Sequence, residues 1–197
     1  MPKISDAQRA AVRGRIIDAT IDVASRKGLV DLAMSDIIRE SGMSAGAIYG
    51  HFDGKDALLI EVAERVMIGR SAELMALAHT TPLPTPAQLL RRLIDAMPPE
   101  IVDGGLVLQI WGAAGAGGSM RPVAMSAVEK LMKGFEVYLT EWFVARGATR
   151  RSAGARARKQ VAAFLGLAQG YLVHRAVLGP EASDRYLAAV DSLLADA

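Results

Sequence analysis

Residues 42–58 read GMSAGAIYGHFDGKDAL, and this stretch decides how the chain around it folds. Ser44 can accept a hydrogen bond from a free backbone N–H at the start of a helix over 45–51. The apolar residues before Gly42 share one face and predict another short helix over 34–40. Two short helices joined by a tight turn form a helix-turn-helix over 33–52, whose second helix fits a DNA major groove about 12 Å wide.

Outward from this motif the chain is predicted to be all-α. Apolar residues three and four apart predict a helix over 7–27, and Gly28 just past it can take the left-handed conformation that ends helices. No segment shows the two-residue alternation of a half-buried strand. The pattern predicts about nine helices, the others lying over 54–78, 86–96, 105–117, 122–146, 152–178 and 183–195.

Composition excludes several classes of protein. Of the 197 residues, 51% are apolar and 22% charged, so a soluble globular chain is expected and not a disordered one. The absence of cysteine excludes disulfides, thiolate metal sites and cysteine nucleophiles, and favours the cytoplasm. Neither a signal peptide nor a membrane span is expected. The three histidines lack metal-ligand spacing, so no metal, cofactor or enzymatic activity is expected.

Charge is balanced in the part of the chain that holds the motif. The first 60 residues contain eight Lys or Arg and eight Asp or Glu, although the whole chain carries +2. Any contact with DNA must therefore depend on how the charges are arranged. Two basic sets are open to DNA contact or to a solvated face, namely Arg9, Arg13 and Arg15, and the later run Arg146, Arg150, Arg151, Arg156, Arg158 and Lys159.

The motif also carries a family resemblance. Residues 42–52 follow the pattern G-x-S-x-G-x-x-Y-x-x-F, and residues 55–58 follow K-D-x-L. Together they resemble the N-terminal domain of TetR-family (TetR/AcrR) transcriptional regulators, without a gap from about Arg15 to Leu58. Farther on, the resemblance is to the family's divergent all-helical domain, and the region of Trp111 is similar to that of BetI-like members.

The resemblance implies a division into domains and a DNA site. Residues 1–58 would form a three-helix DNA-binding domain, and residues 59–197 a helical ligand-binding and dimerisation domain. The recognition helix would be 45–51, and Lys55 would bind a phosphate. The DNA-binding residues so implied are Ser44, Ala45, Gly46, Ala47, Tyr49, Gly50, His51 and Lys55.

The second helix of the motif departs from the family at its start. Members often have Thr or Ser there, whereas this chain has Leu32 and Ala33. The capping hydroxyl and its phosphate contact are therefore missing. Asp31 or Ser35 is expected to substitute for the cap.

The recognition helix carries unusually small residues. Ala45, Ala47 and Gly50 stand where larger polar residues are common, so few side chains can form bidentate bonds with bases. We predict contacts with thymine methyl groups and readout of DNA shape. Ile48 and Phe52, four residues apart on one face, are predicted to belong to the core.

An effector site is expected in the second half of the chain. Gly112 and Gly115 lie inside a helix that carries Trp111, where they would either leave room for a ligand or allow close helix crossing. Methionines and aromatics favour an apolar or flat ligand oriented by Gln109. The residues predicted to bind it are Met67, Gln109, Trp111, Phe135, Tyr138 and Trp142.

The function implied by the resemblance is that of a homodimeric repressor, which binds a palindromic operator in double-stranded DNA and responds to a small molecule. The apolar faces over 153–178 and 183–195 exceed what a small bundle can cover, and predict a four-helix interface with a second copy. Two alternatives stay open. One is a ligand-binding or enzymatic bundle with a vestigial helix-turn-helix, and the other is a protein that coats DNA without sequence preference.

Overall fold

The computed structural model describes residues 6–68, 71–103 and 105–195, and every regular element in these ranges is helical. This confirms the all-α prediction. The elements are α1 Asp6–Lys27, α2 Met34–Ser41, α3 Ala45–Tyr49, α4 Lys55–Ile68, α5 Ser71–Leu77, α6 Pro86–Asp95, α7 Pro99–Asp103, α8 Leu106–Gly115, α9 Met120–Ala145, α10 Arg150–Val173, the π-helical turn η1 His174–Leu178, and α11 Pro180–Ala195.

The described part of the chain thus holds eleven α-helices where about nine were predicted. The segment over 54–78, predicted as one helix, contains both α4 and α5. The short helix α7 begins at Pro99, between the helices predicted over 86–96 and 105–117, where none was predicted. Proline is compatible with the first turn of a helix, because its missing N–H would have no partner there.

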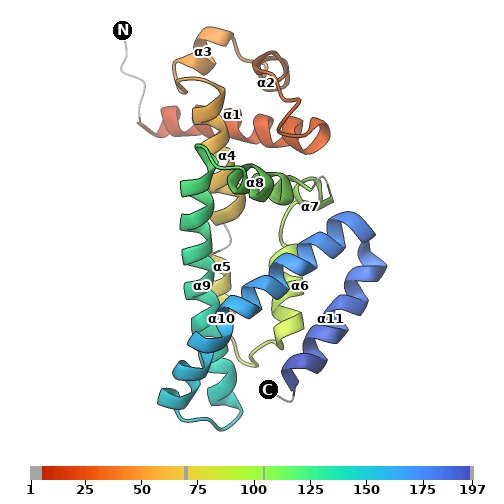
Figure 1. Cartoon of the computed structure of the whole chain (residues 1–197). Coiled ribbons are helices and arrows are strands. Elements are labelled where there is room, and N and C mark those ends of the chain that lie inside the picture. The colour runs from red at the N-terminus through yellow and green to blue at the C-terminus, as the bar shows by residue number, and fades with distance from the viewer. Residues whose placement is uncertain (1–5, 69–70, 104, 196–197) are drawn as a thin grey trace.

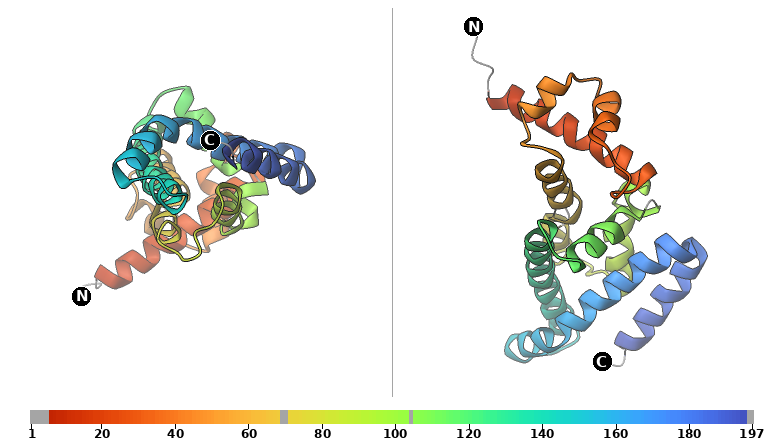
Figure 2. Two further views of the ribbon diagram at one scale, coloured as in Figure 1. Left: turned by 90° about the horizontal axis from the view of Figure 1, so that it is seen from below. Right: turned by 45° about the horizontal axis from the view of Figure 1, so that its top comes forward.

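The helices form an elongated molecule with two distinct ends (Figure 1). Helices α1–α3 make one end, and the connection from α9 to α10 lies at the other; α10 and α11 lie side by side, and the turn between them reaches back to α7, as Figure 2 also shows. The long helix α9 packs beside α4 and α5, while α8 crosses between α1 and the body. Helix α4 runs continuously from the first end into the body, so the boundary expected after residue 58 falls inside a helix.

The first end shares one continuous hydrophobic core with the body. Ile16 and Ala24 of α1, Ile37 of α2 and Ile48 of α3 are all 0% exposed. Burying a large aliphatic side chain contributes about 1.5–3 kcal/mol. Gly28, at φ 88°, ends α1 and allows the chain to turn toward α2. The three helices are therefore fixed relative to one another.

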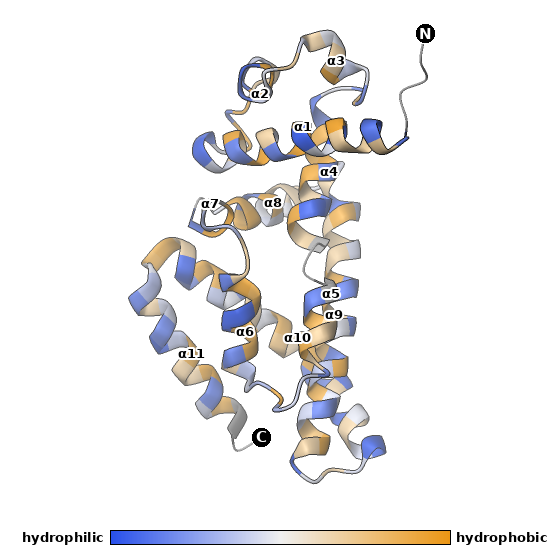
Figure 3. Cartoon of the chain, turned by 180° about the vertical axis from the view of Figure 1, so that it is seen from behind, coloured by the Kyte–Doolittle hydropathy of each residue, from blue (hydrophilic) through white to orange (hydrophobic). Residues whose placement is uncertain are grey.

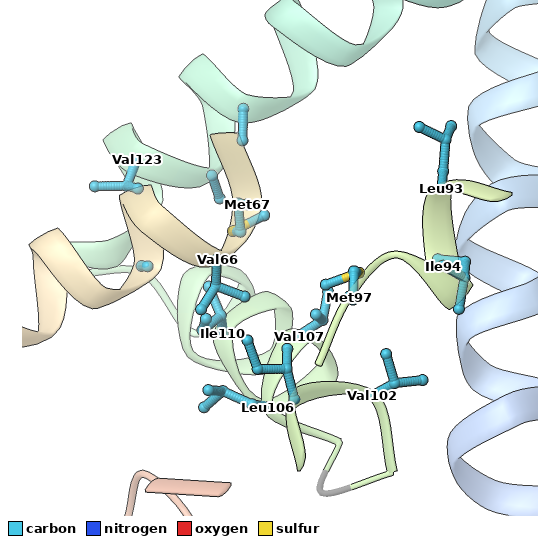
Figure 4. Packing of buried hydrophobic residues seen from close by; sticks show 14 of the residues in the cluster. Val66, Met67, Leu93, Ile94, Met97, Val102, Leu106, Val107, Ile110 and Val123 are labelled. Atoms are coloured by element: carbon cyan, nitrogen blue, oxygen red, sulfur yellow. The ribbon is translucent and has the colours of Figure 1, made fainter. Parts of the chain in front are cut away.

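The body is packed from several helices around α9, and part of its core lies against α8. Met67 of α4, Met97 after α6 and Val107 of α8 lie on facing sides of this core in Figure 4, and each is at least nine-tenths buried. Methionine is unbranched and flexible, so it fills irregular spaces between crossing helices. The core beneath α8 is therefore built from side chains that can rearrange.

One described stretch, Arg150–Leu178, contains an 18-residue window that is long and apolar enough to cross a membrane by length and composition. Of that window, 28% is buried in the fold. Phe164 and Leu165 on this stretch belong to the core. Core helices of soluble proteins pass the same test, so the window alone does not assign the helix to a membrane.

Candidate nucleic-acid interface and internal cavity

Helix α3 is anchored in the core on one side and exposed to solvent on the other. Ser44 caps it, because its Oγ accepts a hydrogen bond from Ala47 N at 3.2 Å. Ile48, 0% exposed, and Phe52, 2% exposed, tie the helix to the core, which confirms both core predictions. The residues predicted to face DNA are all close together at this end: Ser44, Ala45, Gly46, Ala47, Tyr49 and Gly50 are exposed, and His51 and Lys55 are partly exposed.

The exposed face of α3 offers few hydrogen-bonding side chains. Ala45, Gly46, Ala47 and Gly50 carry none, and the Ser44 hydroxyl is engaged in the cap. Tyr49, 53% exposed, has the one long polar side chain on this helix. The surface is therefore smooth, and another backbone can approach it closely.

The start of α2 is stabilised by Asp36. Ala33, the N-cap residue, has no capping side chain, but its N–H donates to the Asp36 carboxylate at 3.2 Å. The same carboxylate accepts from Lys27 Nζ at 2.8 Å and from Arg39 at 2.7 Å. The expectation that Asp31 or Ser35 replaces the missing cap is therefore wrong. An acid at the third helical position reaches back to the cap residue, as in a capping box.

These contacts change the acidity of Asp36. Hydrogen bonds from Lys27 and then from the Ala33 N–H favour the ionised carboxylate and lower its pKa from 3.8 to about 2. Burial opposes the shift, since the residue is only 5% exposed. Asp36 therefore stays charged wherever the protein is folded at ordinary pH.

The side chain of Arg13 is engaged in contacts within the protein. Its Nε donates to Glu61 at 2.8 Å, a second nitrogen bonds the backbone oxygen of His51, and its guanidinium lies 4.1 Å from the centre of the Phe52 ring. It thus joins α1 to α4 and to the segment after α3. Of the three arginines left open above, Arg13 has a structural role, whereas Arg9 and Arg15 are exposed on α1.

Further ion pairs neutralise cations at the same end. Arg26 pairs with Glu40 at 2.6 Å, and Arg65 pairs with Asp18 at 2.9 Å. Exposed pairs of this kind contribute about 0–1 kcal/mol to stability. Their main effect is that α1–α4 present little uncompensated positive charge.

An internal cavity of about 80 Å³ lies where α4, α6, α8, α9 and α10 meet. Three of the predicted ligand-binding residues line it: Met67, Trp111 and Phe135. Most of the other lining side chains are aliphatic, and Gln169 of α10 adds an amide to the wall. The position of Gln169 inside an apolar helical stretch was the sequence signal that could have identified it.

The structure places the other three predicted residues away from this cavity. The side-chain oxygen of Gln109 accepts a hydrogen bond from Leu29 N at 2.7 Å, so Gln109 faces the turn after α1. Tyr138 is fully buried and donates to the Pro84 oxygen at 2.7 Å. Trp142 stacks on Tyr138 and lies under Arg146. None of the three lines the cavity, because Tyr138 and Trp142 lie farther along α9 than Phe135 and Gln109 reaches the turn after α1.

The later basic run lies at the end of α9 and the start of α10, at the opposite end of the molecule from α3 (Figure 1). Arg150 pairs with Glu141 at 2.8 Å and Arg158 with Glu136 at 3.5 Å. Arg156 lies over the ring of Phe143 at 4.1 Å. The arrangement favours a solvated surface over DNA contact. Across the described ranges, no three His, Asp or Glu side chains are grouped so as to hold a metal ion.

Comparison with known sequences identifies the first end of the molecule. Residues 16–62 match the family described as bacterial regulatory proteins, tetR family. The chain is 36% identical over 70 residues to the uncharacterized HTH-type transcriptional regulator TtgW of Pseudomonas putida, which is 36% of this chain and 49% of that protein. It is 32% identical over 95 residues to the HTH-type transcriptional regulator BetI 1 of Chromohalobacter salexigens, which is 48% of this chain and 46% of that protein. The chain thus matches about half the length of these relatives.

Comparison with solved structures extends the likeness to the whole fold. A TetR-family transcriptional regulator from Cytophaga hutchinsonii has a TM-score of 0.72 at 23% identity, over 98% of this chain and 97% of that one. A TetR transcription regulator from Haloarcula marismortui has a TM-score of 0.71 at 20% identity, over 95% and 97% of the two chains. At this level of identity the likeness establishes the fold.

Proposed function

Because the chain belongs to the TetR family through its N-terminal helix-turn-helix, we propose that it is a sequence-specific DNA-binding transcriptional regulator. The observation that carries the proposal is the geometry of α3. Ile48 and Phe52 anchor this helix in the core, and the residues predicted to meet DNA are exposed or partly exposed on its outer side. The domain division at residue 58 is part of the same proposal, as is a cytoplasmic location.

The recognition helix reads DNA mainly by fit. Ala45 and Ala47 contact thymine methyl groups, and Gly46 and Gly50 admit close approach of the sugar-phosphate backbone. Tyr49 and Lys55 contact phosphates and set the register, while His51 lies at the edge of the contact. Specificity then depends on DNA shape more than on hydrogen bonds to base edges.

A second copy covers the apolar surface of α10, η1 and α11 on the flank of the body. Val173 is 43% exposed, Val177 67%, Leu178 59% and Leu193 67%, all within α10, η1 and α11. Apolar residues recur between polar ones along α11 in Figure 3. Two copies joined here form a homodimer whose recognition helices meet a palindromic operator, with half-sites about 34–36 Å apart or a multiple of that distance.

The effector is a small apolar or aromatic molecule that binds the internal cavity. Met67, Trp111 and Phe135 supply apolar contacts, and Gln169 orients a polar atom of the ligand. The effector releases the repressor from DNA only to the extent that it binds better to the conformation that does not fit the operator. The chain acts by binding and not as an enzyme.

Fluorescence anisotropy with the DNA that flanks the gene tests the proposal. We expect tighter binding to this DNA than to random duplex by about 10³-fold or more. Ala47→Leu should weaken specific binding by about tenfold, because it fills the smooth face of α3. Ala155→Leu, an equal change at an exposed position of α10, is the control.

The alternatives predict different results. A vestigial helix-turn-helix would give no binding to either DNA. A coating protein would bind both DNAs equally, with log K falling by about 0.9 per log unit of salt for each phosphate neutralised. Equal affinities of Ala47→Leu and Ala155→Leu would mean that α3 does not read the operator.

A further inference from the structure

Trp111 lines two separate spaces. On one side it forms part of the wall of the internal cavity of about 80 Å³. On the other it lines an open groove of about 410 Å³ on the outer side of α8 and α9, together with Ala114, Gly115, Ala124 and Val128. Arg121 and Glu129, both exposed, also line this groove.

The two spaces follow one another along the line where α8 packs on α9. On α8, Trp111 borders the cavity and Ala114, three residues later, borders the groove. On α9, Leu131 borders the cavity and Val128, three residues earlier, borders the groove. Residues three apart lie on the same face of a helix, so the groove continues the cavity with the indole of Trp111 between them.

The groove has free space beside Gly115, and Trp111, which borders both spaces, is loosely held. A Cβ added to Gly115 would meet no atom within 4 Å. Trp111 is only partly buried and packs against the core by apolar contact. Within the described ranges, its indole forms no hydrogen bond and no ring stack. A change of its rotamer would therefore break only van der Waals contacts.

The volumes show why the partition matters. Sites for drug-sized ligands measure about 300–1,000 Å³, well above the cavity alone. The groove that continues it, at about 410 Å³, lies within that range. We propose that Trp111 gates the effector site. A ligand enters through the groove between α8 and α9 and displaces the indole as it binds.

The same arrangement defines the chemical class of the ligand. It is an elongated molecule with an apolar body, which occupies the cavity, and a polar end, which stays in the groove beside Arg121 and Glu129. Displacement of Trp111 also acts on α8 itself. Gln109, two residues away, accepts a hydrogen bond from the turn after α1. Helix α8 therefore carries both the gating residue Trp111 and a contact with the proposed DNA-binding end. The inference rests on the proposed effector response.

Stopped-flow binding of the neutral fluorophore N-phenyl-1-naphthylamine to the full chain tests whether Trp111 gates ligand entry. Gly115→Leu fills the groove and should slow association about tenfold, whereas Gly112→Leu, an exposed glycine of the same helix outside the groove, should change it by less than about twofold. Trp111→Ala should speed association about tenfold, since no indole has to move. Thermal unfolding of each variant checks that it is folded.

The outcomes separate the two proposals. Equal association rates of Gly115→Leu and Gly112→Leu, with the fluorophore still bound, would overturn the route through the groove and leave the effector site intact. An unchanged association rate in Trp111→Ala would show that the indole does not gate ligand entry. If neither the wild type nor Trp111→Ala bound the fluorophore, the cavity would not be an effector site, and both proposals about the ligand would fail while DNA binding stayed testable by anisotropy.

Discussion

At the scale of single residues, Asp36 shows how one carboxylate replaces a missing cap. It accepts from the N–H of Ala33 and holds Lys27 and Arg39 at the same time. A nearly buried carboxylate with three donors is favourable only while it is charged. The stability of α2 therefore depends on the ionisation of this residue.

We predict that Asp36→Asn lowers the melting temperature at pH 7 and flattens its fall in acid. The folded pKa of Asp36, about 2, lies below the ordinary value of 3.8, so the charged form stabilises the fold above about pH 4. This contribution disappears as the pH falls from 4 toward 2. Thermal unfolding from pH 7 to pH 2 measures the effect, with the exposed Asp31→Asn as control. Parallel curves for wild type and Asp36→Asn would contradict the prediction.

At the scale of elements, the sequence predicted most helices well and their contacts poorly. Periodicity and caps identify a helix such as α1, because both are local properties of the chain. The face that a helix turns to each neighbour depends on packing between distant segments. That is why Gln109 was expected in the cavity, when its side chain reaches the turn after α1 and Gln169 lines the cavity instead. The eight residues predicted to contact DNA lie close together because they fall within 12 consecutive positions, 44–55.

We expect Gln109→Leu to weaken the link between α8 and the first end of the molecule. The Leu29 N–H would lose its acceptor, at about 1–3 kcal/mol if it stayed unpaired. Hydrogen exchange at the Leu29 amide should become faster. Gln169→Leu, the same change at a residue facing the cavity, should leave that amide as protected as in the wild type. Equal exchange in the two variants would show that Gln109 does not protect Leu29.

Helices α5 and α9 approach closely because α9 has a glycine at the crossing. A Cβ added to Gly134 would lie 2.5 Å from Leu74 Cδ2 and 2.8 Å from its Cγ. We predict that Gly134→Ala destabilises the protein by about 1–3 kcal/mol. At Gly166, an exposed glycine of α10 with no atom near an added Cβ, alanine should stabilise by about 0.5–1 kcal/mol.

Urea unfolding of Gly134→Ala, Leu74→Ala and the double variant gives the coupling between the two positions. If the clash is the cause, the double variant is more stable than the sum of the single changes predicts. Additive free energies of unfolding would refute it.

At the scale of the whole molecule, the surface around α3 and the surface of η1 and α11 differ in polarity. The end around α3 is polar and charge-balanced, whereas η1 and α11, on the flank of the body, expose the aliphatic side chains of Val177, Leu178 and Leu193. A large exposed apolar surface commonly marks an interface between proteins. The elongated form keeps the proposed dimer interface away from α3 (Figure 1).

Val177→Glu should convert the dimer into a monomer. A buried, unpaired charge at the interface opposes association. Because two linked half-sites bind far more tightly than one, affinity for the operator should fall by about 100-fold or more. Sedimentation velocity measures the first effect and anisotropy the second, with Ala155→Glu as control. A Val177→Glu variant that sedimented as the wild type does would remove α10 and η1 from the interface.

The internal pairing of cations at the first end has a consequence for life in a cell. Arg13, Arg26, Lys27 and Arg39 already hold carboxylate partners, so little charge is left to retain the protein on arbitrary stretches of the chromosome. If the chain binds DNA as proposed, few molecules would be sequestered by bulk genomic sequence. A low copy number would suffice to keep a target promoter occupied.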